Sequence, residues 1–329
     1  MQDCNPKISI IIPVYNIARW LESCLQSVLG QTFSALEVIA VNDGSTDTSL
    51  SVLENFARQD KRLKIITQPN QGPAAARYTG IQAAQGKWIL FVDGDDLLAP
   101  DYCEKLYEAS ERFQADLVLA SVKYVGEEEL LPALPQASRE PQLLNPLNRK
   151  LLWENFLVLM PLWGKLIARS LAGQVTWQKS RYADDIFPSV QLLVSASQIA
   201  VQPLAVYCYR KGREDSKSKV ASHLFEGLFN DLLHARQFLE SSGSYQRYAP
   251  CFEYMRRVCL LSFIEKYGIS KPEEKLVQEH SADLKVPPGI FKNRPYKFRL
   301  RQWLFDVCLS CHLSYAAISR FIRRITGHG

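Results

Sequence analysis

The sequence has no long hydrophobic run. No uninterrupted stretch of its 329 residues reaches the length of about 18 apolar residues that a membrane-spanning helix needs. The first seven residues, Met-Gln-Asp-Cys-Asn-Pro-Lys, also lack the basic start and the apolar stretch of a signal peptide. We therefore expect a cytoplasmic protein without membrane-spanning helices.

The sequence also lacks a disulfide framework. Its eight cysteines are scattered without paired spacings, which is typical of reduced thiols. One local pattern, Cys308-Leu309-Ser310-Cys311-His312, matches the attachment sequence for c-type haem. That attachment belongs to exported proteins, and here the pattern lies in a segment of amphipathic helical spacing, so we favour an ordinary helix. A zinc site would need a second pair of ligands, and no comparable pair accompanies this one.

The composition is that of a globular protein with a basic end. With 47% hydrophobic and 22% charged residues, the chain can form a sizeable core, and its length suits one large domain or two unequal ones. The net charge of +5 is uneven, because nine Lys or Arg and only one acid, Asp306, occur from Lys285 onward. A mildly acidic body therefore ends in a basic tail.

The first 124 residues alternate short apolar stretches with segments of helical spacing. This alternation is typical of a parallel sheet with crossover helices. The first stretch, Lys7 to Val14, is nearly continuous in isoleucine, as expected when both faces of a strand are buried. The predicted strands are 7–14, 37–42, 63–67, 88–92 and 116–124, and the predicted helices are 18–29, 46–58, 73–84 and 101–112.

After residue 124 the pattern changes. Residues 126–147 are rich in Glu, Pro and Gln and are predicted to form a surface excursion or linker. We predict helices at 151–159 and 185–196 and a strand at 204–210, followed by a largely helical region beyond Ser216. No internal repeat is visible.

Three carboxylates are concentrated where the fourth predicted strand ends, in Phe91-Val92-Asp93-Gly94-Asp95-Asp96. Like charges this close repel and raise each other's pKa, so such clusters are tolerated chiefly where a cation or a substrate neutralises them. Oxygen ligands on a short loop suit a hard divalent ion such as Mg²⁺ or Mn²⁺. An acidic turn that begins the next helix would explain the same residues, because Asp is a good N-cap.

Polar motifs also follow the first three predicted strands. Ligands bind beyond the carboxyl ends of the strands in an open parallel sheet. Each motif alone has an ordinary interpretation as a turn or a helix cap, but their joint occurrence at one edge favours a ligand site. They are Pro13-Val14-Tyr15-Asn16, Asn42-Asp43-Gly44-Ser45-Thr46-Asp47, and Asn70-Gln71-Gly72 with Ala76-Arg77.

In this order and at these spacings, the four motifs resemble those of the family 2 glycosyltransferases, which bind nucleotide sugars on a GT-A fold. Trp163-Gly164-Lys165-Leu166 and Ala183-Asp184-Asp185-Ile186-Phe187 continue the resemblance, which covers residues 7–215. It implies an α/β, Rossmann-like fold with a mostly parallel sheet flanked by helices and a helical C-terminal extension. The implied domains are a catalytic domain at 1–215, with a nucleotide-binding half at 1–124 and an acceptor half at 145–215, and a helical, basic region at 216–329.

The resemblance also implies roles for individual residues. Asp43 would accept a hydrogen bond from uracil, Tyr15 would stack on the base and Arg77 would reach the nucleotide. Asp95 would hold Mn²⁺ or Mg²⁺ against the diphosphate, where the ion stabilises the leaving group, and Asp93 would approach the ribose or the metal. The full set expected to bind the nucleotide sugar is Pro13, Tyr15, Asp43, Arg77, Asp93 and Gly94.

An inverting transfer also needs a general base on the opposite face of the sugar. In the family, this base is the Asp of a Glu-Asp pair at a helix start, and the corresponding catalytic pair here is Asp184-Asp185. Asp185 aligns with the base, whereas Asp184 is one methylene shorter than the usual Glu. A helix cap favoured by the macrodipole would also explain the pair. Downstream, Arg210 or Arg213 could hold the diphosphate, and surface solvation explains both equally well.

The expected function is a single transfer. The Gln-x-x-Arg-Trp signature of processive polysaccharide synthases is absent. The resemblance therefore implies a hexosyltransferase that moves one sugar from a UDP-sugar to a hydroxyl of a glycan or lipid-linked oligosaccharide, in bacterial surface polysaccharide synthesis. A nucleotidyltransferase is disfavoured because no Gly-rich, basic phosphate loop lies near the N-terminus. A catalytically silent scaffold that binds nucleotide sugars is the other alternative, and the intact Asp95 and Asp185 argue against it.

The basic tail favours contact with a membrane surface. Residues 296–325 combine apolar and basic side chains, and we predict that they contact the inner face of the membrane as a peripheral anchor. A helical subdomain packed on the core or on a second subunit is the alternative, which leaves homo-oligomerisation open. No nucleic-acid-binding motif accompanies the basic residues, so we expect no nucleic-acid partner.

Overall fold

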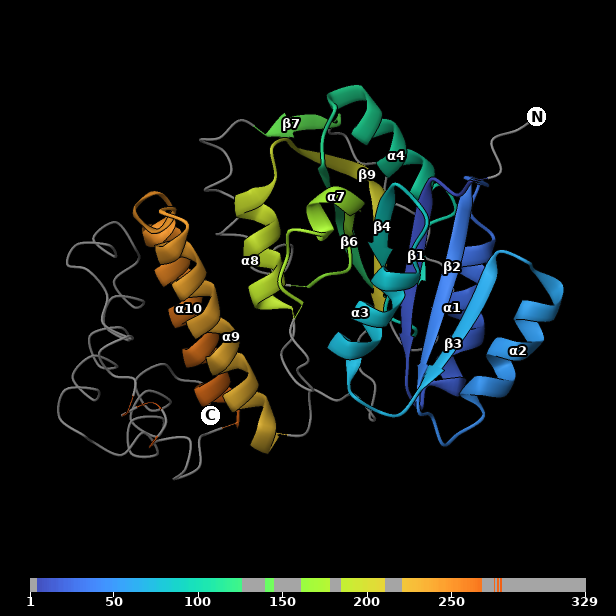
Figure 1. Cartoon of the computed structure of the whole chain (residues 1–329), viewed down its shortest axis with the longest axis horizontal. Coiled ribbons are helices and arrows are strands. Elements are labelled where there is room, and N and C mark those ends of the chain that lie inside the picture. The colour runs from blue at the N-terminus through green and yellow to red at the C-terminus, as the bar shows by residue number, and fades with distance from the viewer. Residues whose placement is uncertain are drawn as a thin grey trace. The chain divides into compact units, whose positions relative to one another are not determined.

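The computed structural model describes residues 5–125, 140–144, 161–177, 185–210 and 221–267, together with Lys275, Val277 and Glu279. The chain divides into two compact units, 1–216 and 217–329. A sheet with flanking helices forms the first unit, and the second contains α9 (Ala221–Ser241) and α10 (Tyr245–Tyr267), as Figure 1 shows.

Within the described residues, nine strands form one sheet. They are β1 (Ile8–Val14), β2 (Leu36–Asp43), β3 (Leu63–Gln68), β4 (Trp88–Phe91), β5 (Leu97–Leu98), β6 (Leu117–Val125), β7 (Gln142–Leu144), β8 (Lys165–Ala168) and β9 (Ile199–Arg210). Their order is β3-β2-β1-β4-β8-β6-β9-β5, and β7 also pairs with β9. The pairs among β1 to β4 and the pair β6–β9 are parallel, whereas β5, β7 and β8 are antiparallel to their neighbours.

Six helices flank this sheet in the described part of the first unit. They are α1 (Ala18–Leu29), α2 (Ser49–Gln59), α3 (Pro73–Ala83), α4 (Tyr102–Phe113), α7 (Arg169–Ala172) and α8 (Ile186–Ser195). The chain steps outward from β1 through β2 to β3 and then returns past β1 to β4. Because such crossovers are right-handed, α3 lies on the face of the sheet opposite to α1 and α2 (Figure 1).

The centre of the sheet is buried on both faces. Every residue of β2 and β4 is buried, and so is every residue of β1 except Pro13, which is half-buried. Continuous apolar strands are what a parallel sheet covered by helices on both sides requires. The edge strand β3 has only Leu63 fully buried. The predicted α/β class with a mostly parallel sheet is therefore confirmed.

The predicted elements of the first 124 residues are all present, with small shifts at their ends. The clearest shift is at α2, which was predicted from residue 46 and begins at Ser49. The backbone N–H groups of Thr46 and Asp47 donate to the Asn16 side chain (2.8 and 3.3 Å), and the Ser49 N–H donates to Asp47 Oδ1 (2.9 Å). Thr46 and Asp47 thus belong to the loop that precedes the helix.

Two predictions downstream were wrong in part. Residues 142–144, predicted as part of a linker, form β7 and pair with the start of β9. The strand predicted at 204–210 begins earlier, at Ile199, and a register shift opposite Ala120/Ser121 accommodates Pro203, which cannot donate to the ladder. The short strands β5 and β8 were not predicted. The predicted helix 151–159, the Cys308–His312 pattern and the tail 296–325 lie outside the described residues.

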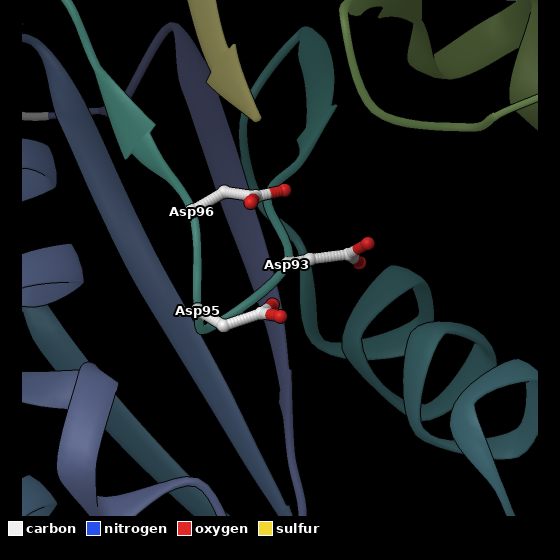
Figure 2. A group of neighbouring side chains, drawn as sticks. All are labelled: Asp93, Asp95 and Asp96. Atoms are coloured by element: carbon white, nitrogen blue, oxygen red, sulfur yellow. The ribbon is translucent and has the colours of Figure 1, made fainter. Parts of the chain in front are cut away.

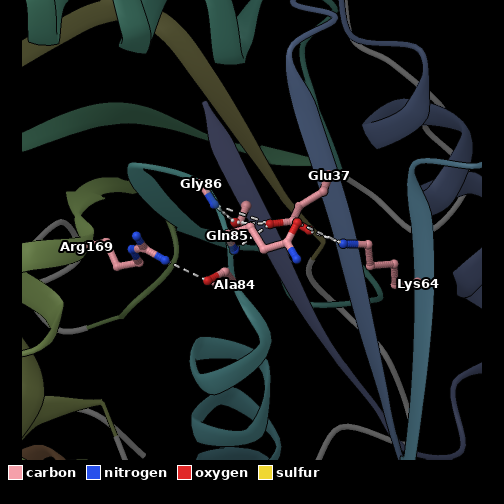
Figure 3. Close-up of polar contacts among 7 residues, drawn as sticks. Glu37, Lys64, Ala84, Gln85, Gly86 and Arg169 are labelled. Carbon is pink, nitrogen blue, oxygen red and sulfur yellow. Dashed lines mark hydrogen bonds and ion pairs between the residues drawn. The ribbon is translucent and has the colours of Figure 1, made fainter. Parts of the chain in front are cut away.

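Glu37 braces the sheet edge that faces away from the strand-end motifs (Figure 3). This buried carboxylate accepts hydrogen bonds from Ser9 Oγ (2.6 Å) and from the backbone N–H of Gln85 (2.7 Å), and it pairs with Lys64 Nζ (2.7 Å). Burial alone would raise the pKa of Glu37, but the donors Lys64, Ser9 and Gln85 lower it below the ordinary value. Arg169 Nη1 donates to Ala84 O (2.9 Å) beside this network. These contacts fix the loop from α3 into β4.

The second unit has a core of its own between α9 and α10. Phe225 and Phe229 are buried on α9, and Phe252 is buried on α10. The fully buried Glu253 pairs with Arg256, and the Tyr245 hydroxyl donates to Glu253 at 2.9 Å. Among the helices that the structure describes, none is both long enough and apolar enough to cross a membrane.

Candidate active site

The acidic loop after β4 brings three carboxylates together. Ligand oxygens of Asp93, Asp95 and Asp96 lie within 4.8 Å of one another, and Figure 2 shows all three side chains on the same side of the loop. A hydrogen bond from Asp96 N–H to Asp93 O (2.9 Å) closes the turn. A Cβ at Gly94 would lie 2.4 Å from Ile17 Cδ1, so a larger residue here would require the end of the Ile17 side chain to shift.

Asp96 has a structural role within this cluster. It is fully buried, and it accepts hydrogen bonds from the Tyr207 hydroxyl (2.7 Å) and from the backbone N–H of Arg210 (2.8 Å), both at the end of β9. Burial raises the pKa of Asp96 well above its ordinary value, and the negative charges of Asp95 and Asp93 raise it further. Asp96 therefore ties the acidic loop to β9.

Asp93 and Asp95 fit a divalent ion better than Asp96 does. Both are only partly buried, and their carboxylates lie beside each other at the carboxyl edge of the sheet. An all-oxygen donor set of this kind matches Mg²⁺ or Mn²⁺. The Tyr207 hydroxyl accepts a hydrogen bond from the Asp93 N–H (3.1 Å), so the same tyrosine positions two of the three acids.

Asp43 is buried at the end of β2 and anchors the loop before α3. Its carboxylate accepts hydrogen bonds from Gln68 Nε2 (2.7 Å) and from the backbone N–H groups of Gln71 (3.0 Å) and Gly72 (2.8 Å). Gly72 has φ = 93°, a conformation that glycine adopts most readily. A carboxylate has about four acceptor positions, so three donors leave capacity for one more. The predicted contact of Asp43 with uracil stays a prediction.

The motifs after β1 and β2 are joined through Asn16, which has φ = 50°. Its backbone N–H donates to Ser45 Oγ (3.2 Å), and its side-chain amide donates to Thr46 Oγ1 (3.2 Å). Asp47 Oδ2 in turn accepts the N–H of Ala18 at the start of α1 (3.1 Å). This network holds the two loops together and places the half-buried Pro13 and Tyr15 at the carboxyl edge of the sheet.

Arg77 joins the acidic loop to the start of α8. The residue lies on α3 and is 4% exposed. Its Nη2 lies 2.9 Å from Asp93 Oδ1, and its Nη1 lies 3.3 Å from Asp185 Oδ1. Asp185, which immediately precedes α8, is thereby brought to the acidic loop from 92 positions further along the chain. Asp184 lies outside the described residues.

Two further basic side chains lie near these acids. Lys165, at the start of β8, is fully buried and donates to Pro161 O; burial lowers its pKa to about 7, although the charge of Asp185 acts to raise it. Arg210 Nε donates to Asp95 O (2.9 Å), and its guanidinium lies 4.7 Å from the ring centre of Trp20. Arg210 is therefore part of the site, whereas Arg213 lies outside the described residues.

Sequence reasoning missed Tyr207, which contacts both Asp93 and Asp96. Trp163 stacks on the Tyr207 ring with centroids 4.6 Å apart and an interplanar angle of 9°, which fixes the orientation of that ring. Trp163 was recognised as part of a motif, but nothing in the local sequence links it to a tyrosine more than 40 positions away. Only the packing of β9 against the acidic loop reveals this contact.

Comparisons with known proteins agree with this arrangement. The family described as Glycosyl transferase family 2 matches residues 9–164. The chain is 30% identical over 213 residues to glycosyltransferase GlyG of Streptococcus pneumoniae serotype 4, a match that covers 62% of this chain and 70% of GlyG. It is 29% identical over 265 residues to glycosyltransferase GlyA of the same organism, covering 78% of this chain but only 38% of GlyA. The chain thus spans little more than a third of GlyA.

Among solved structures, the crystal structure of S. aureus TarS 1-349 in complex with UDP-GlcNAc is similar to this chain. The TM-score is 0.68 at 20% sequence identity, and the match covers 84% of this chain and 80% of the TarS chain. At this identity the likeness concerns the fold, a mixed α/β structure of the GT-A type. From GlyG, together with the family match and the shared fold, the chain belongs to glycosyltransferase family 2.

Proposed function

We propose that this glycosyltransferase moves a single sugar, with inversion, from a UDP-sugar to a hydroxyl of a glycan or lipid-linked oligosaccharide. One observation carries the proposal: Arg77 pairs with both Asp93 and Asp185. Two carboxylates with different expected roles, one on the donor side and one as the base, are thereby held on a single guanidinium. A site for transfer between two substrates needs this proximity.

The donor would bind over the ends of β1, β2 and β4. Tyr15 would offer a ring face to the base, and Asp43 would offer its remaining acceptor position to the uracil N–H. The TarS structure with a similar fold contains UDP-GlcNAc, which supports a UDP-sugar as donor. Asp95 and Asp93 would hold Mn²⁺ or Mg²⁺, which when bound would neutralise charge on the departing diphosphate. Gly94 keeps the loop backbone close to Ile17, and Arg210 adds positive charge beside Asp95.

Asp185 would act as the general base. Its carboxylate would accept the proton of the acceptor hydroxyl while that oxygen attacks the anomeric carbon, and the bond from this carbon to the UDP oxygen would break on the opposite face. Arg77 pairs with Asp185 at 3.3 Å, and Lys165 interacts with the same carboxylate electrostatically, so basic side chains surround the proposed base. Asp184, one position earlier, would help to position the acceptor.

The acceptor and its location follow from analogy with the family. We propose a product that belongs to a bacterial surface polysaccharide, with residues 296–325 at the inner surface of the membrane. Sedimentation with vesicles that contain anionic lipids tests the membrane contact. Binding by the full chain, weakened by salt and by deletion of residues 296–329, would support this location, and equal sedimentation of the deletion variant would contradict it.

Calorimetry with UDP, GDP and CDP, each with Mn²⁺ and with EDTA, tests the donor class directly. Binding of UDP that depends on Mn²⁺, with GDP and CDP at least about tenfold weaker (1.4 kcal/mol), is the expected result. A screen of UDP-sugars with an acceptor mixture would then identify the transferred sugar. Failure of all three nucleotides to bind would contradict the assignments of Asp43 and Asp95 together.

A further inference from the structure

We propose that Arg77 is a positioning residue that sets the place of the Asp185 carboxylate relative to the donor side of the site. This inference rests on the proposed function, because it assigns Asp185 as the base. It differs from the role that the family resemblance implies for Arg77, which is contact with the nucleotide. The difference lies in which groups engage the guanidinium.

In the structure, the Arg77 guanidinium is engaged by two carboxylates of the site. The Arg77 side chain is 5% exposed, whereas Asp93 and Asp185 are 28% and 30% exposed. Each of its two terminal nitrogens pairs with one of these carboxylates. The arginine is thus buried behind two acids that remain accessible, so substrates would meet the acids first. Since the guanidinium is planar and rigid, its two pairs fix the acids relative to each other.

The helix that carries Arg77 is held at both ends. At its start, Asp43 accepts the N–H groups of Gln71 and Gly72, and after its end, Glu37 accepts the N–H groups of Gln85 and Gly86. Both carboxylates belong to β2, so α3 is fixed to this strand at both of its ends. The backbone of Arg77 is therefore held in a fixed position relative to β2.

The position of Asp185 depends on such a contact. Asp185 is the residue before α8, far along the chain from the acidic loop, so tertiary contacts must hold its carboxylate near that loop. Its contact with Arg77 links it to α3 and, through Asp93, to the end of β4. Misplacement of a reacting group by about 1 Å can lower a rate about 100-fold. Loss of the Arg77 contact should therefore lower the turnover number more than the affinity for the nucleotide.

The test uses Arg77→Ala and Arg77→Lys in the full chain, with Arg169→Ala as a matched control. Arg169 also lies on the α3 side of the sheet and donates to Ala84 O, directly after the end of α3 (Figure 3), but it contacts none of the described carboxylates of the site. For Arg77→Ala we expect kcat to fall by about 100-fold while the Kd for UDP with Mn²⁺ changes by less than about threefold. Arg169→Ala should leave kcat unchanged.

Chemical rescue separates positioning from general damage to the fold. Guanidinium ion at millimolar concentration should restore at least about tenfold of the lost kcat in Arg77→Ala, because it can occupy the space between the two carboxylates. It should have no effect on Arg77→Lys, whose single ammonium keeps the charge but not the two-pronged geometry. If Arg77→Ala fails to fold, a lower kcat at unchanged Kd in Arg77→Lys carries the test.

Two results would overturn the inference alone: an Arg77→Ala variant with wild-type kcat, or one whose whole defect is a weaker Kd for UDP. The second result would return Arg77 to a role in nucleotide binding. By contrast, a wild-type chain that binds no nucleotide would overturn the proposed function and, with it, this inference. The wild-type titration therefore distinguishes the two failures.

Discussion

Each end of β2 carries a buried carboxylate that accepts backbone N–H groups next to α3, but the two carboxylates have different electrostatic surroundings. At the start of the strand, Glu37 accepts the N–H groups of Gln85 and Gly86 after α3. At the end of the strand, Asp43 accepts the N–H groups of Gln71 and Gly72 before α3. Both carboxylates are buried, at 3% and 2% exposure. A buried acid that binds backbone N–H groups is thus a means of fixing α3, whatever else it does.

The difference is in the neutralising charge. Glu37 pairs with Lys64, whereas Asp43 makes no ion pair within the part of the chain that the structure describes. The same edge as Asp43 also gathers Asp95 and Asp96, and their mutual repulsion contributes to the raised pKa of Asp96. The amino edge of the sheet is arranged for stability. The carboxyl edge retains negative charge, at some cost in stability, and a divalent cation would neutralise that charge.

The largest effect is expected at Asp185. Asp185→Asn should lower the transfer rate by about 1,000-fold, because an amide cannot accept the acceptor proton, yet it keeps an oxygen for the contact with Arg77. The Kd for UDP with Mn²⁺ should stay within about threefold of the wild type. Rate assays and calorimetry on the same preparation check both parts. Wild-type turnover in this variant would contradict the assignment of the base.

A smaller effect is expected at Asp95. Asp95→Ala should weaken UDP binding at least about tenfold in Mn²⁺ and change it little in EDTA, because we propose that the lost carboxylate holds the metal. Removing one of the repelling charges should leave the thermal midpoint unchanged or raise it. Calorimetry and thermal unfolding without metal measure the two quantities. Equal weakening with and without Mn²⁺ would place Asp95 outside the metal site.

Glu37→Gln should show the opposite behaviour at the amino edge. The variant should lose about 2 kcal/mol of unfolding free energy at pH 7, because hydrogen bonds to a charged group are replaced by weaker ones and Lys64 loses its partner. The folded-state pKa of Glu37 lies below its ordinary value of 4.5. The contribution of Glu37 is therefore complete above pH 4.5 and is lost as the pH falls through the lower, folded-state pKa.

Urea unfolding of both proteins at several pH values checks this sign. The difference in stability between wild type and Glu37→Gln should be full at pH 7 and should shrink as the pH falls below 4.5. The kcat of the variant at neutral pH should match that of the wild type. A difference in stability that grows on acidification would contradict the role given to the Glu37 charge.

At Asp43 the effects on stability and on binding can be separated. Asp43→Asn should lose stability like Glu37→Gln, because it holds the loop before α3 in the same way. If its remaining acceptor position meets uracil, the variant should also bind UDP about tenfold more weakly. Glu37→Gln is the matched control and should bind UDP normally. Equal UDP affinity in the two variants would reduce Asp43 to a structural role.

The first half of the fold was predictable because it is built from local signals. Strands β1, β2 and β4 are short apolar runs, so their burial on both faces could be expected from the sequence, and helices of clear spacing follow β1, β2 and β3. The short strands β5 and β8 have two and four residues, too few for a periodic pattern. Strand β7 lies in a segment rich in Glu, Pro and Gln, whose composition predicts a linker, and it is a strand because it pairs with β9.

For the candidate site too, some features were predictable from the sequence and others were not. The sequence by itself determined which strand ends carry polar motifs, the acidic loop among them, because residue types and their spacing are local. The tertiary structure alone decided that Arg77 lies between Asp93 and Asp185, and that Tyr207 braces Asp93 and Asp96. These contacts join segments up to 114 positions apart, and no local pattern encodes them. They follow from the place of β9 in the sheet and from the packing of the residue before α8 against Arg77, because burial and ion pairing depend on the whole fold and not on neighbouring residues in the sequence.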